Sequence, residues 1–126
     1  MRSLKEFEMV AAKSGINNAA KKLYKEFMQK NSLSKAEKDK RQNVVVNGET
    51  FGVSVKTRNT PFIECRQFDV DYKGFITLDT TNGKVFLTTR SNVKSSGKSL
   101  VRPKSNKEAL SVQATKFIEL DFYSVF

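Results

Sequence analysis

The chain has 126 residues, which is enough for one folded domain with its own hydrophobic core. It contains no histidine and a single cysteine, which excludes Ser-His-Asp and Cys-His catalytic sites, histidine metal ligands, an internal disulfide and a thiolate zinc site. The 23 Lys and Arg residues against 13 Asp and Glu give a formal net charge of +10, and a field of this sign attracts polyanions, nucleic acid first among them.

Two helices joined at Gly15 are expected at the start of the chain. The sequence Ser3–Glu6 has the form of a capping box, and apolar residues then recur at helical spacing until Gly15. A second helix is expected to begin at Asn17 or Asn18, because an apolar stripe follows there at the same spacing. This stripe consists of Ala20, Leu23 and Phe27, with Tyr24 as a further candidate. A further capping pattern, Ser34–Glu37, predicts a short exposed helix or a charged connector.

Residues 43–90 are expected to form β-structure. The pairs Asn47-Gly48 and Asn82-Gly83 are each flanked by β-branched and aromatic residues. Asn and Gly readily supply the positive φ that both central positions of a type I′ turn need, so two β-hairpins are predicted. The expected strands are Glu49–Lys56, Phe62–Phe68, Phe75–Thr80 and Lys84–Arg90. In the second of these the alternation leaves two registers open, one burying Ile63, Cys65 and Gln67 and the other Phe62 and Phe68.

The C-terminal part begins with a basic segment and ends in a strand. Residues 91–107 contain five basic residues and no acid among Ser, Asn, Gly and Pro, which is typical of a mobile loop. From Ser111 the apolar residues favour one face, which predicts a final strand. The expected fold class is therefore α+β: a basic helical hairpin (residues 1–42) followed by a β domain (residues 43–126), a small antiparallel sheet or partly open barrel of about five strands, together forming one folded unit.

The positive charge lies mainly outside the β region. The net charge is +6 in residues 1–42, +1 in residues 43–90 and +3 in residues 91–126. We therefore expect a non-catalytic protein that binds nucleic acid, DNA or RNA, with low sequence specificity through its phosphates. The expected contact residues are Lys21, Lys22, Lys25, Arg58, Phe86, Arg90, Lys94, Lys98, Arg102, Lys104 and Lys107. Phe86 is a candidate for base stacking because Lys84, Thr88 and Arg90 share its strand face; the alternative is that the N-terminal helices cover it.

Two other functions fit the sequence. One is a protein-binding inhibitor or assembly subunit that docks on an acidic partner or an oligomeric shell, through the edges of the hairpins or the apolar residues Tyr123 and Phe126. The other is a metal-dependent nuclease without histidine, with Asp69, Asp71 and Lys73 around the scissile phosphate. The same three residues also fit a solvated turn.

No catalytic residue, metal site or cofactor is expected for the nucleic-acid-binding function. The longest apolar run is only a few residues, and the N-terminus lacks the apolar segment of a secretion signal. We therefore expect no contact with a membrane and an intracellular location, cytoplasmic or nucleoid-associated. Cys65 is expected to be an inert core thiol.

Overall fold

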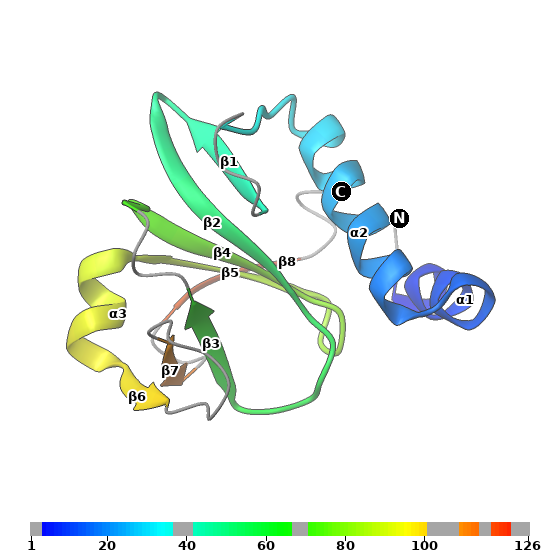
Figure 1. Cartoon of the computed structure of the whole chain (residues 1–126). Helices are drawn as coiled ribbons and strands as arrows, with labels where there is room; N and C mark the ends of the chain where they lie inside the picture. The colour runs from blue at the N-terminus through cyan, green and yellow to red at the C-terminus, as the bar shows by residue number, and fades with distance from the viewer. Residues whose placement is uncertain (1–3, 37–41, 67–70, 101–108, 114–116, 122–126) are drawn as a thin grey trace.

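Two sheets and their helices form the fold (Figure 1). The computed structural model describes residues 4–36, 42–66, 71–100, 109–113 and 117–121. Within these ranges the larger sheet has the strand order β1-β2-β4-β5-β8 and the smaller one the order β3-β7-β6. The elements are α1 (Leu4–Ser14), α2 (Ile16–Lys30), β1 (Asn43–Val46), β2 (Glu49–Lys56), β3 (Phe62–Arg66), β4 (Gly74–Asp79), β5 (Lys84–Thr89), α3 (Arg90–Ser96), β6 (Lys98–Leu100), β7 (Ala109–Gln113) and β8 (Ile118–Asp121). The α+β class is confirmed.

The N-terminal helical hairpin is confirmed, with Gly15 between its helices. The Gly15 N–H donates to the carbonyl of Ala11 at 2.9 Å, and the Gly15 carbonyl accepts from the N–H of Ala19 at 3.0 Å. Gly15 thus ends α1 and begins α2. Its φ of +91° is a conformation that glycine adopts without a steric penalty. Helix α2 buries Leu23 and Phe27 of the predicted stripe against the larger sheet, together with Ala19 in place of Ala20, which is only half-buried.

The connector after α2 contains no helix in the part that the structure describes. Ser34 forms an isolated bridge with Val45 of β1. Of the two alternatives predicted for this segment, the short helix is therefore wrong over residues 34–36, which form a connector; residues 37–41 lie outside the described part. A buried asparagine fixes this connection. The side-chain Oδ1 of Asn43 accepts from the N–H of Ala36 at 2.8 Å, and its backbone carbonyl accepts from the Tyr24 hydroxyl at 2.6 Å.

The first Asn-Gly hairpin has the predicted turn. Val46 pairs with Glu49 across Asn47 and Gly48, whose φ values are +52° and +79°. Both central residues therefore have the positive φ of a type I′ turn.

The second Asn-Gly hairpin has a longer loop than expected. Strands β4 and β5 do pair, but Asp79 faces Lys84, so residues 80–83 form the loop. Of the two central residues, Gly83 has a positive φ of +65° and Asn82 does not. The prediction of a two-residue type I′ turn is wrong here. The reason is the Asp79 carboxylate, whose Oδ1 accepts from the N–H and the hydroxyl of Thr81 at 2.8 and 2.6 Å and so folds the loop back on itself.

The larger sheet is mixed, which corrects the expectation of an antiparallel sheet. Strands β2 and β4 run parallel, with Phe51 opposite Gly74 and Lys56 opposite Asp79. Between them the chain leaves the sheet to form β3 in the smaller sheet and then returns (Figure 1). All six residues of β4 are buried, because the helices cover one of its faces and the smaller sheet covers the other.

The two faces of β4 belong to two hydrophobic cores. On the helix side the core joins Phe7, Leu23 and Phe27 to alternate residues of the strands; these are Val44, Val53, Ile76, Leu78 and Val85. On the other side, Phe75 and Phe86 pack against the smaller sheet and α3. In β3 the structure selects the register with Ile63 and Cys65 buried, each 2% exposed, and leaves Phe62 46% exposed.

The basic segment after β5 is partly regular, which corrects the predicted loop. Residues 90–96 form α3, whose N-cap Thr89 accepts from the N–H of Asn92 at 3.2 Å. Val93 anchors this helix with no exposed surface. Strand β6 follows, and residues 101–107 lie outside the described part.

The predicted final strand is two strands in different sheets. Strand β7 pairs with β3 and β6, whereas β8 pairs with β5. Val112 and Phe117 are buried but Ile118 is 66% exposed, so the alternation does not continue from one strand to the other. In the part of the chain that the structure describes, no helix has both the length and the apolar character needed to cross a bilayer.

Candidate functional site

Three of the predicted contact residues lie together on α2. Lys21, Lys22 and Lys25 are exposed, and they lie opposite the stripe that α2 buries. Successive residues of an α-helix are about 100° apart, so these three lysines lie within about one third of the helix circumference. We call them the α2 basic face. Exposed Asn18 and Gln29 extend it along the helix.

The predicted contact residues on and next to α3 form a surface separate from the α2 basic face. Lys94 and Lys98 are exposed and Arg90 is half-buried. Helix α3 contributes to the core between the two sheets, whereas α2 contributes to the core on the other face of the larger sheet (Figure 1). The predicted interface is therefore divided between two sides of the larger sheet. Its remaining members, Arg102, Lys104 and Lys107, lie outside the described residues.

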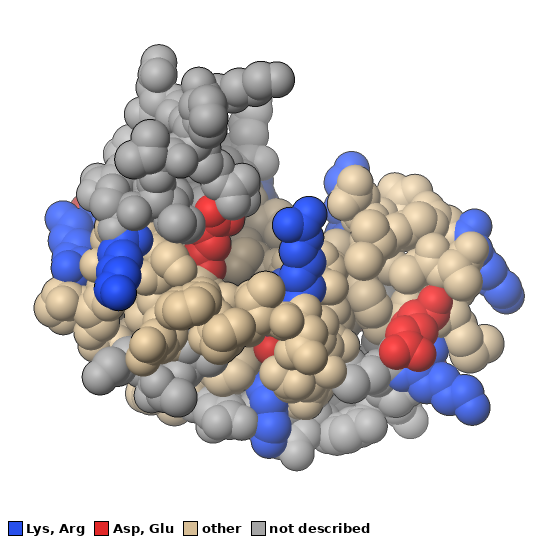
Figure 2. Space-filling view, turned by 90° about the horizontal axis from the view of Figure 1, so that it is seen from below, with Lys and Arg blue, Asp and Glu red and all other residues tan. Residues whose placement is uncertain are grey.

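Cationic side chains are more frequent than acidic ones on the face shown in Figure 2, and they stand apart from one another. Of the exposed acids in the described part, Glu6 and Glu8 are on α1 and Glu49 and Asp71 are in the β region, whereas the acid of α2, Glu26, is half-buried. The α2 basic face is thus a place where three cations adjoin without an exposed acid of the same helix between them.

Phe86 is not available for base stacking, and the prediction for this residue is wrong. It is 6% exposed and packs edge-to-face on Phe117, with ring centroids 6.1 Å apart at 77°. The cover is not the N-terminal helices either. Phe86 pairs with Thr77 and belongs to the core between the two sheets, a layer that the sequence pattern did not predict.

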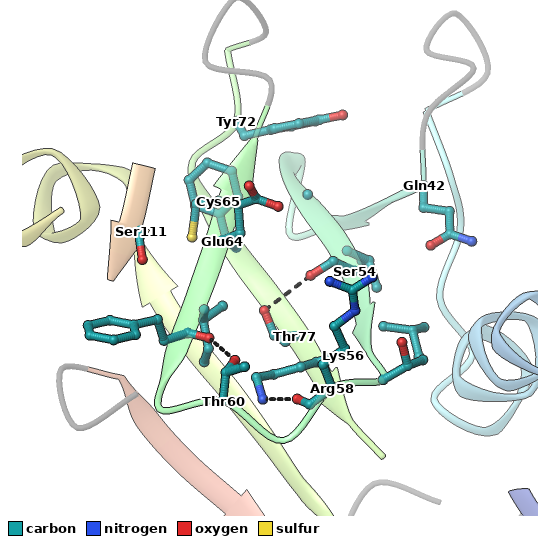
Figure 3. A pocket seen from close by; sticks show the side chains of 17 residues that line it. Gln42, Ser54, Lys56, Arg58, Thr60, Glu64, Cys65, Tyr72, Thr77 and Ser111 are labelled. Carbon is teal, nitrogen blue, oxygen red and sulfur yellow. Dashed lines mark hydrogen bonds between the residues drawn. The ribbon is translucent and has the colours of Figure 1, made fainter. Parts of the chain in front are cut away.

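Arg58 lies in a cleft of about 700 Å³ between β2 and β3. The two strands diverge from the loop that contains Arg58 and Thr60, and Tyr72 closes the far end (Figure 3). Ser54 and Thr77 form the floor, where their hydroxyl oxygens are 3.2 Å apart. Sequence reasoning missed this cleft. The only indication of it in the sequence was the alternation of polar and apolar residues in β2 and β3.

A buried ion pair holds the lower end of the cleft. Lys56 Nζ lies 3.9 Å from Asp79 Oδ2, and the two side chains are 10% and 2% exposed. Lys56 Nζ also donates to the backbone carbonyl of Arg58. The Lys56 carbonyl in turn accepts from the N–H and the hydroxyl of Thr80 at 3.0 and 2.8 Å. The end of β2 is thereby fixed to the loop between β4 and β5.

Cys65 forms part of the cleft wall, and its thiol is unreactive. Burial raises the pKa of its thiol to about 12, and the neighbouring Glu64 carboxylate adds to this effect. Because the thiolate is the reactive form of cysteine, this thiol is a poor nucleophile near neutral pH. The expected inert core thiol fits this position.

The residues of the nuclease hypothesis do not converge in the described part of the chain. Lys73 and Glu49 lie 3.7 Å apart, with both side chains more than half exposed, and Asp71 is exposed as well. Asp69 lies outside the described residues. Among those that are described, no three Asp, Glu or Cys side chains are grouped as metal ligands would be.

Comparisons of this chain with models of protein families, with curated proteins and with solved structures found no match.

Proposed function

We propose that this chain is a non-catalytic nucleic-acid-binding protein of low sequence specificity. The observation that carries the proposal is the α2 basic face, where exposed Lys21, Lys22 and Lys25 lie opposite the buried stripe of the same helix. The net charge of +10 supports it, since a positive field of this size raises the rate of encounter with polyanions.

The chemistry of lysine favours phosphate contacts without sequence readout. Its ammonium group is a flexible point charge, whereas a base edge is usually read by a fixed bidentate group. Residues 21 and 25 are one helical turn apart, about 6 Å along the axis, and a DNA strand carries one phosphate per about 3.4 Å of helix rise. The three lysines can therefore neutralise neighbouring phosphates of one strand. Phosphate contacts position a protein but carry no sequence information directly.

Replacing the three lysines together is expected to weaken binding. In the triple variant Lys21→Gln, Lys22→Gln, Lys25→Gln, affinity for a labelled oligonucleotide should fall about tenfold or more near 0.1 M salt, because up to three counterion-releasing contacts are lost. Fluorescence anisotropy measures this. The matched control is Lys5→Gln, Lys13→Gln, Lys73→Gln, which removes the same charge from exposed lysines outside α2. Equal losses in the two triple variants would refute the role of the α2 basic face.

A protein partner is the second candidate, favoured by one observation on β8. This strand is at the end of the larger sheet, and its Ile118 is 66% exposed. A strand edge with an exposed apolar residue suits the addition of a partner strand. A complex with a defined protein that persists after nuclease treatment and is lost in Ile118→Lys would favour this candidate over the first.

A further inference from the structure

The smaller sheet leaves part of the larger sheet uncovered at β2. Its strands pack on β4 and β5, which contribute Phe75 and Phe86 to the core between the two sheets, whereas β2 contributes none of the described residues of this core. On the same side of β2, Ser54 is exposed. Stacked sheets lie about 10 Å apart. The cleft of about 700 Å³ between β2 and β3 therefore lies where a further strand of the smaller sheet would cover β2.

Strand β3 forms the edge of the smaller sheet along this cleft. β7 pairs with β3 from Phe62 to Arg66, and no other strand of the described part pairs with it. Figure 3 shows β7, which carries Ser111, on one side of β3 and the cleft on the other. An edge strand offers backbone N–H and C=O groups with which an extended peptide can pair. β3 has five residues, which at about 3.3 Å per residue is enough to pair with a short peptide.

The two faces of β3 determine which side chains suit a paired peptide. Ile63 and Cys65 point towards the larger sheet and are each 2% exposed, whereas Phe62 points away from it and is 46% exposed. Side chains of neighbouring strands that face each other lie on the same side of the sheet. A peptide residue opposite Phe62 would therefore lie on the outer face, where an apolar side chain can contact the ring. The next residue would point to the cleft floor beside Ser54.

The cation available at the cleft floor is Arg58. Lys56 is occupied by Asp79 and by the Arg58 carbonyl. Arg58 is exposed, and its guanidinium points into the cleft towards Ser54 (Figure 3). Among the described residues this guanidinium has no ion-pair partner, and the acid in the cleft lining, Glu64, lies towards the other end (Figure 3). A guanidinium binds a carboxylate through two parallel hydrogen bonds, so an acidic residue suits the position that points to the floor.

We propose that this cleft binds an extended acidic peptide segment of a partner protein, which adds a fourth strand to the smaller sheet next to β3. Apolar and acidic residues alternate in this segment, so that an apolar residue contacts Phe62 and an acidic residue binds Arg58. The cleft volume of about 700 Å³ is within the range of ligand sites, about 300–1,000 Å³. The inference goes beyond the proposed function, because the cleft is on the face of the larger sheet opposite to α2.

The first test uses a fluorescein-labelled peptide of about seven residues in which Val and Glu alternate, a length that exceeds β3 by one residue at each end. Fluorescence anisotropy compares it with a peptide of the same composition whose Val and Glu residues are grouped in two blocks. The wild-type chain is expected to bind the alternating peptide about tenfold more tightly, because only this order presents one apolar and one acidic face. Equal affinity for the two peptides would overturn the proposal.

Arg58 variants test the acidic contact. Arg58→Ala should weaken binding of the alternating peptide about tenfold, because a charge-assisted pair is lost. Arg58→Glu should bind it more weakly still and should bind a peptide with Lys in place of Glu more tightly than the wild-type chain does. Lys13→Ala, which removes one exposed charge from α1, is the matched control and should keep the wild-type affinity. Thermal unfolding checks that each variant is folded.

Amide hydrogen exchange locates the bound peptide. The alternating peptide is expected to slow exchange in β3 about tenfold or more, since its backbone pairs with the edge of this strand. Slower exchange in β8 without a change in β3 would overturn the proposal. A dimer of the free chain that the peptide dissociates would also overturn it, because the occupant of the cleft would then be a second copy of this chain.

The α2 triple variant separates this inference from the proposed function. Lys21→Gln, Lys22→Gln, Lys25→Gln should lose oligonucleotide affinity and keep the wild-type affinity for the alternating peptide. If it loses peptide affinity as much as Arg58→Ala does, the attraction is a property of the net charge, and the cleft proposal is overturned. A wild-type chain that binds the alternating peptide but no oligonucleotide would refute the proposed function and support the cleft proposal.

Discussion

Replacing Asp79 by alanine is expected to lower the free energy of unfolding by about 3 kcal/mol. The Asp79 side chain is 2% exposed and sits beside Lys56, which is 10% exposed. Without the carboxylate, a largely buried ammonium loses its anion, and such an uncompensated charge is among the costliest single defects in a folded protein.

The loss extends beyond the ion pair. Asp79 Oδ1 is the acceptor for the N–H and hydroxyl of Thr81, and Oδ2 lies 3.3 Å from Asn82 Nδ2. Without these two acceptor oxygens, the loop between β4 and β5 loses its hydrogen bonds to the Asp79 side chain. Asp79→Asn retains an oxygen acceptor but no charge, so its loss of stability should be intermediate.

Urea unfolding followed by circular dichroism measures both variants. Asp71→Ala is the control, because Asp71 is an exposed carboxylate and exposed substitutions usually change stability by less than about 0.5 kcal/mol. If Asp79→Ala unfolds at the same urea concentration as Asp71→Ala, the buried ion pair does not have the role assigned to it.

Leu23→Ala is expected to cost about 3 kcal/mol, within the range of about 2–5 kcal/mol for a buried leucine. Leu23 is fully buried where α2 meets the larger sheet, in the same core as Phe27, Val44 and Leu78. Truncation leaves a cavity at the point that holds α2, and hence the α2 basic face, against the sheet.

Met9→Ala is the control for this prediction, because Met9 is 55% exposed on α1. Its unfolding free energy should change by less than about 0.5 kcal/mol. A Leu23→Ala variant as stable as Met9→Ala would show that α2 is not anchored through this residue.

The sequence predicted correctly those elements whose conformation depends mainly on residues adjacent in the chain. Gly15 marked the junction of two helices because its φ of +91° suits a residue without Cβ. Asn47-Gly48 predicted a type I′ turn because both residues tolerate positive φ. Asn82-Gly83 is the same dipeptide, but hydrogen bonds from Thr81 to the Asp79 carboxylate stabilise a longer loop there. A rule based on the dipeptide alone does not include this competing acceptor.

What sequence reasoning missed depends on contacts between distant segments. For Phe86 the sequence left two alternatives, exposure for base stacking or cover by the N-terminal helices, because its strand was interpreted as part of a single sheet; β3 and β7 instead form a second layer over it. The parallel pairing of β2 with β4 has the same origin, because the chain leaves the larger sheet between these two strands and forms β3 in the smaller sheet. Arg58 was selected as a cation at the end of a strand; the sequence did not indicate that it faces a cleft between β2 and β3, which belong to different sheets.

The most direct test of nucleic-acid binding by the α2 basic face is the salt dependence of affinity for the labelled oligonucleotide. We predict that affinity falls about tenfold or more between about 50 and 200 mM salt, as expected when three or more phosphate contacts release counterions. The slope should become shallower by about two in the Lys21, Lys22 and Lys25 triple variant. No binding, or an affinity that does not change with salt, would contradict the account.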